Sequence, residues 1–216
     1  MMDTATAQQN HPAIIRILAH IVSVVFHPLF ITSYVGAFLI YLHPYAFAAA
    51  LDNRKVFKLG MIVFNTAFIP LFSVFLMWRL RLIESLFLRT SKERIIPYVA
   101  AMICYFWTWL VTRNTGDSPS YMVHFMLGTF LAICAAFLVN IYMKVSMHTI
   151  AMGGMATFFF LQAFAIEDST GLYFSIAVLI AGLVGTARMI VSDHKPVEIY
   201  VGYLVGIICQ LIALAF

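Results

Sequence analysis

Near its C-terminal end the chain spaces an arginine, a histidine and a carboxylate closely in otherwise apolar sequence: Arg188, His194 and Glu198. Ionisable groups in membrane-spanning sequence are energetically costly, so their presence indicates a site that uses them. Pro196 is suited to the first turn of a helix, where its missing N–H costs nothing. The amides at that helix N-terminus favour an anion beside His194. We therefore expect chemistry on a phosphate held at a membrane surface.

Glu198 follows His194 by four residues, which brings its carboxylate within reach of one imidazole nitrogen. A hydrogen bond there fixes the tautomer of the ring and leaves the other nitrogen free to attack. Arg188 approaches from the end of the preceding apolar run. The alternative interpretation is a cluster of interfacial salt bridges without a chemical role.

A second polar cluster contains Lys144, Ser146 and His148, just before another apolar run. The serine hydroxyl and the imidazole can both face a bound oxyanion. Histidine can donate a proton near neutral pH, which suits a general acid. The alternative here is an interfacial histidine at the start of a helix.

A third polar cluster contains Arg89, Lys92 and Arg94, three cations within six residues. Such a group can grip a phosphate through bidentate and point-charge contacts. The alternative is a basic loop that touches lipid headgroups.

The composition indicates which kind of secondary structure positions these clusters. Of the 216 residues, 63% are hydrophobic and 10% are charged, whereas about a quarter of the residues of a soluble domain are charged. Apolar runs of about 17–25 residues, the length that crosses a bilayer, recur along the chain. The net charge of +4 is small and scattered, which argues against nucleic-acid binding. The three cysteines lie inside apolar runs and are interpreted as packing residues.

We predict an all-α polytopic transmembrane helical bundle with six core spans and an additional N-terminal span or interfacial helix. Residues 1–11 are expected to form a polar tail, and residues 12–216 a single membrane domain. The segment 12–26 carries Arg16 and His20 and is the interfacial helix or the start of a long first span. The spans are predicted at roughly 29–50, 57–78, 97–113, 121–142, 148–166, 171–191 and 196–216.

The order of the spans places the three clusters on one membrane face. Two spans separate the 89–94 segment from His148, and two more separate His148 from Arg188. The opposite face receives four acidic residues and no comparable cluster: Asp52, Asp117, Glu167 and Asp168. Scattered polar residues are not expected to sort in this way, so the clusters are interpreted as one site.

These residues resemble the type 2 phosphatidic acid phosphatase superfamily, whose pattern has three parts. The third part runs Ser-Arg, five residues, His, three residues, Asp. Arg188, His194 and Glu198 keep that spacing, with Ala187 in place of the serine and glutamate in place of aspartate.

The second part, Pro-Ser-Gly-His, is matched by Ser146 and His148, while Val145 and Met147 replace the proline and the glycine. The first part is a lysine that precedes an Arg-Pro pair. When Pro97 is aligned, Arg89 takes the lysine position, Ile96 the arginine position, and Arg94 lies two residues earlier. The resemblance spans roughly residues 89–206.

The resemblance implies a phosphatase that acts without a metal or other cofactor. His194 would attack phosphorus and form a phosphohistidine, Glu198 would orient it, and His148 would protonate the leaving oxygen. A water would then release phosphate. Charge on the phosphoryl oxygens would be stabilised by Arg188, Ser146, Arg94, Arg89, Lys92 and Lys144. The substrate would be a membrane lipid phosphate or diphosphate: undecaprenyl diphosphate, phosphatidic acid, phosphatidylglycerol phosphate or a lipid A type phosphate.

Two alternatives stay open: a lipid phosphotransferase of the same fold, and a non-catalytic lipid-binding or transport protein. We expect a multi-pass protein of the inner (cytoplasmic) membrane. The positive-inside rule taken literally puts the clusters in the cytoplasm, but the cations that produce the bias belong to the clusters themselves. The resemblance favours the outer, periplasmic face. The oligomeric state stays open.

Several other polar residues receive structural interpretations. His27-Pro28 and His43-Pro44 are typical of helix ends. Asn140 and Gln162 are expected to bond to neighbouring helices, with Asn140 also a candidate supporting residue of the site. Gly202 and Gly206, four residues apart, are interpreted as a surface for close helix packing.

Overall fold

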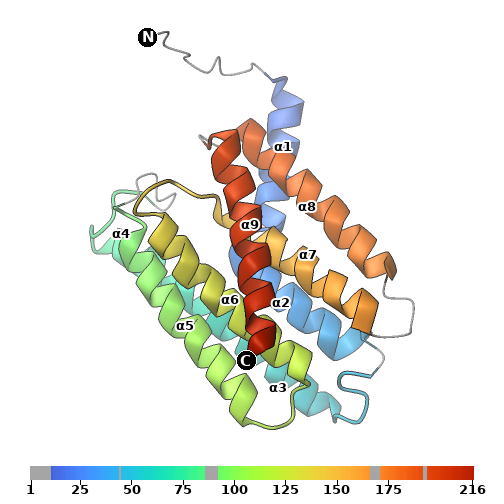
Figure 1. The fold of residues 1–216 in the computed structure, drawn as a ribbon. Helices are drawn as coiled ribbons and strands as arrows, with labels where there is room; N and C mark the ends of the chain where they lie inside the picture. Colours follow the sequence, from blue (N-terminus) through green and yellow to red (C-terminus); the bar gives the residue numbers. More distant parts are fainter. Residues whose placement is uncertain (1–10, 44, 86–91, 166–170, 192–193) are drawn as a thin grey trace, which may run out of the picture.

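The computed structural model describes residues 11–43, 45–85, 92–165, 171–191 and 194–216. Every regular element within these ranges is a helix, so the predicted all-α polytopic bundle is confirmed (Figure 1). The elements are α1 (Ala13–Val25), α2 (Pro28–Ala37), the π-helical η1 (Phe38–Leu42), α3 (Asp52–Val63), the π-helical η2 (Phe64–Phe68), α4 (Ile69–Arg79), α5 (Ile95–Asn114), α6 (Ser120–Val139), α7 (Met147–Ala165), α8 (Gly171–Val191), α9 (Pro196–Ile212) and the 3₁₀ turn η3 (Ala213–Ala215).

Six helices of the described chain are long and apolar enough to cross a membrane. The first of them is the continuous run α3–η2–α4, from Asp52 to Arg79, and the others correspond to α5 through α9. The segments α1 and α2–η1 form a further pair, with a bend of 58° between them. If this pair is counted as one span, the described chain has up to seven spans. This arrangement matches six core spans with one additional N-terminal element.

The bend between α1 and α2 has a local cause. Pro28 opens α2, and the Nδ1 atom of His27 accepts the backbone N–H of Leu29 at 3.4 Å, which caps the new helix. The helix α1 packs against α8, and its two buried residues are the small Ala19 and Ser23. His27 is therefore a helix-end residue, as the sequence indicates.

Two predicted span boundaries were wrong. The span 29–50 ends as a helix at Leu42, because the Nδ1 atom of His43 accepts two backbone N–H groups of the following turn, at 3.3 and 3.1 Å. The span 57–78 begins earlier, at Asp52. A carboxylate in the first turn stabilises the positive end of a helix, so the polar residues before position 57 are helical.

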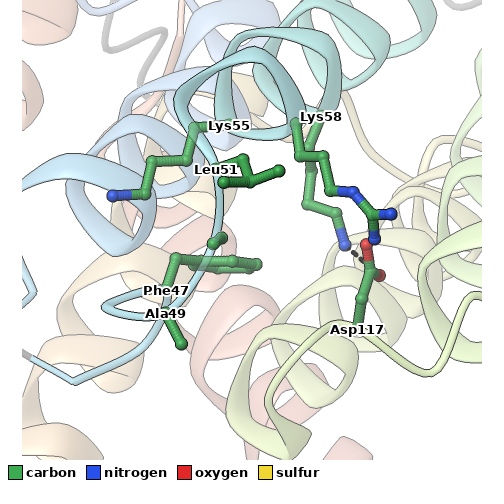
Figure 2. A pocket seen from close by; sticks show the side chains of 8 residues that line it. Phe47, Ala49, Leu51, Lys55, Lys58 and Asp117 are labelled. Atoms are coloured by element: carbon green, nitrogen blue, oxygen red, sulfur yellow. Dashed lines mark hydrogen bonds and ion pairs between the residues drawn. The ribbon is translucent and has the colours of Figure 1, made fainter.

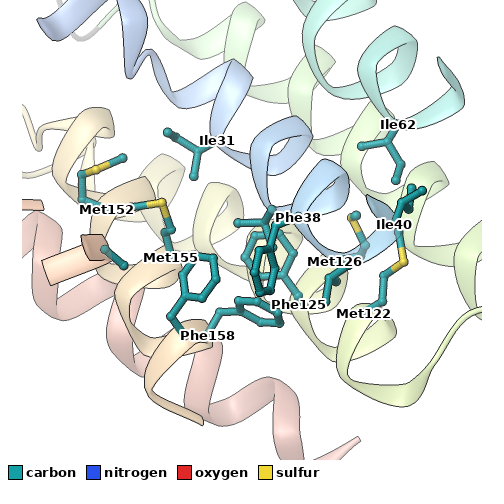
Figure 3. Packing of buried hydrophobic residues seen from close by; sticks show 14 of the residues in the cluster. Ile31, Phe38, Ile40, Ile62, Met122, Phe125, Met126, Met152, Met155 and Phe158 are labelled. Carbon is teal, nitrogen blue, oxygen red and sulfur yellow. The ribbon is translucent and has the colours of Figure 1, made fainter. Parts of the chain in front are cut away.

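The larger of the two apolar cores joins α2–η1, α3, α6, α7 and α8 (Figure 3). The rings of Phe125 and Phe158 lie 4.9 Å apart between α6 and α7, and those of Phe38 and Phe159 also lie 4.9 Å apart between η1 and α7. Apolar contacts of this kind hold membrane helices together through van der Waals packing. They make α7 the central helix of the bundle.

Close packing of α9 against α7 depends on glycine, as the sequence predicts. A Cβ atom on Gly206 would lie 2.8 Å from the backbone nitrogen of Gly154 and would overlap the carbonyl oxygen of Ile150. A Cβ atom on Gly202 would lie 2.9 Å from the carbonyl oxygen of Ser146. The start of α9 is thus held directly against the start of α7, and α9 runs between α6 and α7 (Figure 1).

Candidate functional site

The described residues of the three polar clusters lie at one end of the bundle. The backbone N–H of Ser146 donates to the carbonyl oxygen of Glu198 at 3.3 Å, which joins the α6–α7 loop to α9. The guanidinium of Arg94, at the start of α5, donates to the carbonyl oxygen of Val145 at 3.2 Å. Each cluster is therefore linked to the next through backbone contacts, in agreement with the arrangement that the order of the spans predicts.

His194 and Glu198 form the predicted hydrogen bond. The imidazole Nδ1 and the carboxylate Oε2 are 2.8 Å apart, with side-chain exposures of 4% and 13%. Because a carboxylate only accepts, Nδ1 carries the proton and Nε2 keeps a free lone pair. The same Oε2 accepts the backbone N–H of Lys195 at 3.1 Å, so the capping of α9 fixes the carboxylate that orients the imidazole.

The surroundings of His194 favour the neutral ring. Burial lowers the pKa of His194, and the positive charges of Arg188 and Arg94 lower it further, while the hydrogen bond and charge of Glu198 act in the opposite direction. The net result is a pKa below the ordinary 6.5. Near neutral pH the Nε2 lone pair is therefore available for attack on an electrophile.

Arg188, at the end of α8, is the central charge of the site. Its guanidinium acts electrostatically on the imidazoles of His27, His148 and His194. An arginine beside three histidines gives a concentration of hydrogen-bond donors and positive charge that suits a phosphate dianion.

His148 lies in the first turn of α7 and points toward the N-terminal element. Its Nε2 is 3.0 Å from the carbonyl oxygen of Ser23 on α1, and since a carbonyl only accepts, Nε2 carries a proton. Only Nδ1 remains to exchange a proton with a ligand. The ring of His27 packs edge-on against His148 with centroids 5.3 Å apart.

The sequence predicts His27 only as a helix-end residue, but the structure places it at the site as well. The residue does cap α2, but its ring also contacts His148, and the positive charge of Arg188 acts on it electrostatically. The available signal was its position: a first span that begins near residue 28 starts on the same face as the three clusters.

Ser146 offers a buried hydroxyl to this site. Its side chain is 0% exposed, and its Oγ has no hydrogen-bond partner among the described residues. The backbone of Ser146 is held on two sides, by its N–H bond to Glu198 and by the hydroxyl of Thr149, which donates to its carbonyl oxygen at 3.0 Å. A buried hydroxyl of this kind is suited to a ligand that supplies the missing acceptor.

The remaining predicted residues are placed less closely. Lys92 is exposed and Lys144 is half-buried, and neither side chain makes a hydrogen bond or ion pair with another described residue. Arg89 lies outside the described residues. Asn140 is buried at the C-terminal end of α6, near the Ser146 loop. Gln162 approaches His43 on a neighbouring element at 3.5 Å, as predicted for an interhelical contact.

No group of three or more His, Cys, Asp or Glu side chains in the described chain is arranged to hold a metal ion. The site residues are instead cations, imidazoles, one carboxylate and a hydroxyl. This donor set can bind an oxyanion, stabilise charge on it and transfer protons to and from it.

No family model, curated protein or solved structure matches this chain. Function has therefore to be inferred from the fold and from the geometry of the site.

Proposed function

We propose that the protein is an integral-membrane phosphatase that hydrolyses a lipid phosphate monoester or diphosphate through a phosphohistidine at His194. The observation that carries the proposal is the 2.8 Å hydrogen bond between His194 Nδ1 and Glu198 within a buried cationic site. This bond leaves Nε2 as the free nucleophile. The resemblance of the three clusters to the type 2 phosphatidic acid phosphatase superfamily is a second support.

In the first step Nε2 of His194 attacks phosphorus, so that a P–N bond forms and the P–O bond to the lipid breaks. The leaving oxygen takes a proton from Nδ1 of His148, since Nε2 of that ring is bonded to Ser23. The negative charge of the bound phosphate favours the protonated ring that this step needs. The products are a phosphohistidine and a neutral lipid hydroxyl, or a lipid monophosphate if the substrate is a diphosphate.

In the second step water attacks the phosphohistidine. An O–P bond forms, the P–N bond breaks, and Nδ1 of His148 takes the proton that the water loses. Arg188, Arg94 and the Ser146 hydroxyl would stabilise charge on the phosphoryl oxygens through both steps. Inorganic phosphate leaves, and His194 returns to its neutral form.

The substrate is proposed to be a lipid because the site lies at the ends of membrane-spanning helices, where a headgroup phosphate is presented. Undecaprenyl diphosphate, phosphatidic acid, phosphatidylglycerol phosphate and lipid A type phosphates have the required chemistry. We place the protein in the inner membrane with this end on the periplasmic side.

Phosphate release from a panel of these lipids in detergent tests the proposal. His194→Ala is expected to lower turnover by about 10³-fold or more. Arg113→Gln should leave turnover unchanged, because Arg113 is exposed and lies at the end of α5 that is far from the site. Full activity of His194→Ala would contradict the mechanism. A phosphorylated acceptor lipid in place of free phosphate would assign the same site to a phosphotransferase.

A further inference from the structure

The end of the bundle opposite the candidate site contains two adjacent cavities that the proposed phosphatase chemistry does not use. Their volumes are about 230 and 390 Å³. They lie between the start of α3 and the loop that joins α5 to α6, and both are lined by Arg54, Lys58 and Asp117. We call the pair the α3 cavity.

Lys58 and Asp117 form the wall that the two parts of the α3 cavity share, and Lys58 points toward Asp117 in Figure 2. The side chain of Lys58 is only 9% exposed, and it pairs with Asp117 and donates to the Ser118 hydroxyl at 2.6 Å. Burial would raise the pKa of Asp117, but hydrogen bonds from Lys58 and Thr115 outweigh it and hold that pKa below its ordinary value. The Asp117 carboxylate is therefore ionised near neutral pH, and its pair with Lys58 ties α3 to the α5–α6 loop.

Arg54 and Lys55 give the α3 cavity positive charge in excess of this pair. The guanidinium of Arg54 makes no ion pair with any described residue. The side chain of Lys55 is 19% exposed, and the carboxylate of Asp52, its recorded ion-pair partner, is 4.0 Å away and 98% exposed. An exposed pair at that distance contributes little. The lining thus sets three cations against the single carboxylate of Asp117, which favours an anion.

The α3 cavity also has an apolar side. Phe57 and Met61 line the larger part, and they follow Arg54 along α3 at the spacing that places residues on one helix face. Phe57 is 76% exposed and Leu51, at the mouth of the smaller part, is 65% exposed. Cations at the membrane surface followed by exposed apolar side chains match the headgroup and acyl chain of a phospholipid.

We propose that the α3 cavity binds the phosphate group of an anionic phospholipid from the leaflet at this end of the bundle. The planar guanidinium of Arg54 would take two phosphate oxygens, while the ammonium of Lys55, which points away from Asp117 in Figure 2, would add only long-range positive charge. The acyl chain would lie along Phe57 and Met61. A free phosphate ion shares the same headgroup chemistry, so the experiment has to separate the two sources.

The test uses the purified full chain in neutral detergent micelles. Thermal unfolding is followed while the micelles are doped with dioleoyl phosphatidylglycerol, with dioleoyl phosphatidylcholine, or while inorganic phosphate is added without lipid. Phosphatidylglycerol is expected to raise the midpoint. In Arg54→Gln the concentration needed should increase about tenfold, the loss of one strong charged contact. Arg54→Gln/Lys55→Gln should need little further increase, because the Lys55 ammonium points away from Asp117 in Figure 2.

Arg113→Gln is the matched control, because it removes the same charge at the same end of the bundle and Arg113 packs on Trp109 outside the α3 cavity. It should respond to phosphatidylglycerol as the wild type does. Native mass spectrometry of bound lipid supplies a second readout. Equal stabilisation by phosphatidylcholine, or an unchanged response of the Arg54 variants, would overturn the proposal.

Stabilisation by inorganic phosphate alone, lost in the Arg54 variants, would support the phosphate chemistry with a soluble source. Phosphate release measured on the same samples separates this inference from the proposed function. The Arg54 variants should retain turnover at the other end of the molecule, and His194→Ala should retain phosphatidylglycerol binding.

Discussion

At the scale of single residues, the orientation of His194 follows from the Glu198 carboxylate, which accepts two hydrogen bonds. Glu198 caps α9 through the N–H of Lys195 and holds the Nδ1 proton of His194 with the same oxygen. The local sequence is sufficient to build this arrangement, because a proline in the first turn and a glutamate two residues later fix the capping geometry. The proposed nucleophile and the carboxylate that orients it therefore lie within five consecutive residues, 194–198.

Replacement of Glu198 by glutamine tests the electrostatic role of this carboxylate. Glutamine still offers an acceptor oxygen but no charge, and Glu198 raises the pKa of His194. The variant should therefore have a lower His194 pKa, and the acidic limb of its kcat/KM profile should move to lower pH. Turnover should fall by about 10²-fold. Asp52→Asn, a 98% exposed carboxylate, is the control, and a limb that moves to higher pH would argue against the assigned role.

Ser146→Ala separates a binding role from a structural one. The Ser146 hydroxyl is buried without a partner among the described residues, so its removal relieves a desolvation cost and breaks no bond. The free energy of unfolding should stay within about 1 kcal/mol of wild type or rise, while kcat/KM falls by about 10–10²-fold. Chemical denaturation and phosphate release on the same preparation give both values. A destabilised variant with normal kinetics would show that the serine is structural.

At the scale of elements, the site depends on how closely α9 approaches α7. Ser146 at the start of α7 touches the backbone of α9, and Gly202 and Gly206 remove the side chains that would keep the helices apart. The helices α8 and α5 then bring Arg188 and Arg94 to the same end. This close packing fixes the positions of Ser146 and His194, which lie just before α7 and α9, relative to one another.

Gly206→Ala should disturb this packing, because the new methyl group would meet the backbone of Ile150 and Gly154. We expect a loss of about 1–3 kcal/mol in stability, seen as a lower thermal midpoint. Gly182→Ala is the matched control, since a Cβ atom there meets nothing within 4 Å. It should leave the midpoint unchanged or raise it slightly. Equal midpoints for the two variants would mean that α7 and α9 are not in close contact.

The sequence predicts the spans and the proximity of Arg94, Ser146 and Glu198, because span length is a local property of the chain and the membrane face of each loop follows from counting the spans. It does not predict that His148 bonds to Ser23 or packs against His27. Those contacts depend on how α1 packs against α8, and the two buried residues of α1 are the small Ala19 and Ser23. The end of the α2–η1 segment at Leu42 agrees with the interpretation of His43 as a helix-end residue, whereas the predicted span limit at residue 50 does not.

At the scale of the whole molecule, the two ends of the bundle have different charge arrangements. The candidate site end buries histidines and arginines around one carboxylate, and the opposite end holds the Lys58–Asp117 pair and the α3 cavity. Six membrane-spanning helices separate the two ends. This separation predicts two chemically distinct faces of the membrane.

Labelling with a membrane-impermeant maleimide tests the separation. Two cysteine variants report on the two ends of the bundle. Tyr142→Cys is at a position 90% exposed beside the candidate site, and Asn114→Cys is at the end of α5 far from that site. The two cysteines should react from opposite sides of intact cells or spheroplasts. We expect Tyr142→Cys to react from the periplasm. The cysteine-free parent, with Cys104, Cys134 and Cys209 replaced, provides the background. Labelling of both positions from the same side would contradict the arrangement of spans.

The covalent intermediate is the most direct test of the central claim. Wild-type protein mixed with a radiolabelled lipid phosphate and quenched rapidly in alkali should carry an acid-labile, alkali-stable label that peptide mapping assigns to His194. With a lipid diphosphate labelled on its terminal phosphate, the leaving lipid monophosphate depends little on the proton from His148, so accumulation should be greatest in His148→Ala, which lacks the group proposed to activate water in the second step. The label should be absent from His194→Ala. Turnover with no phosphohistidine at His194, or label on another residue, would contradict the account.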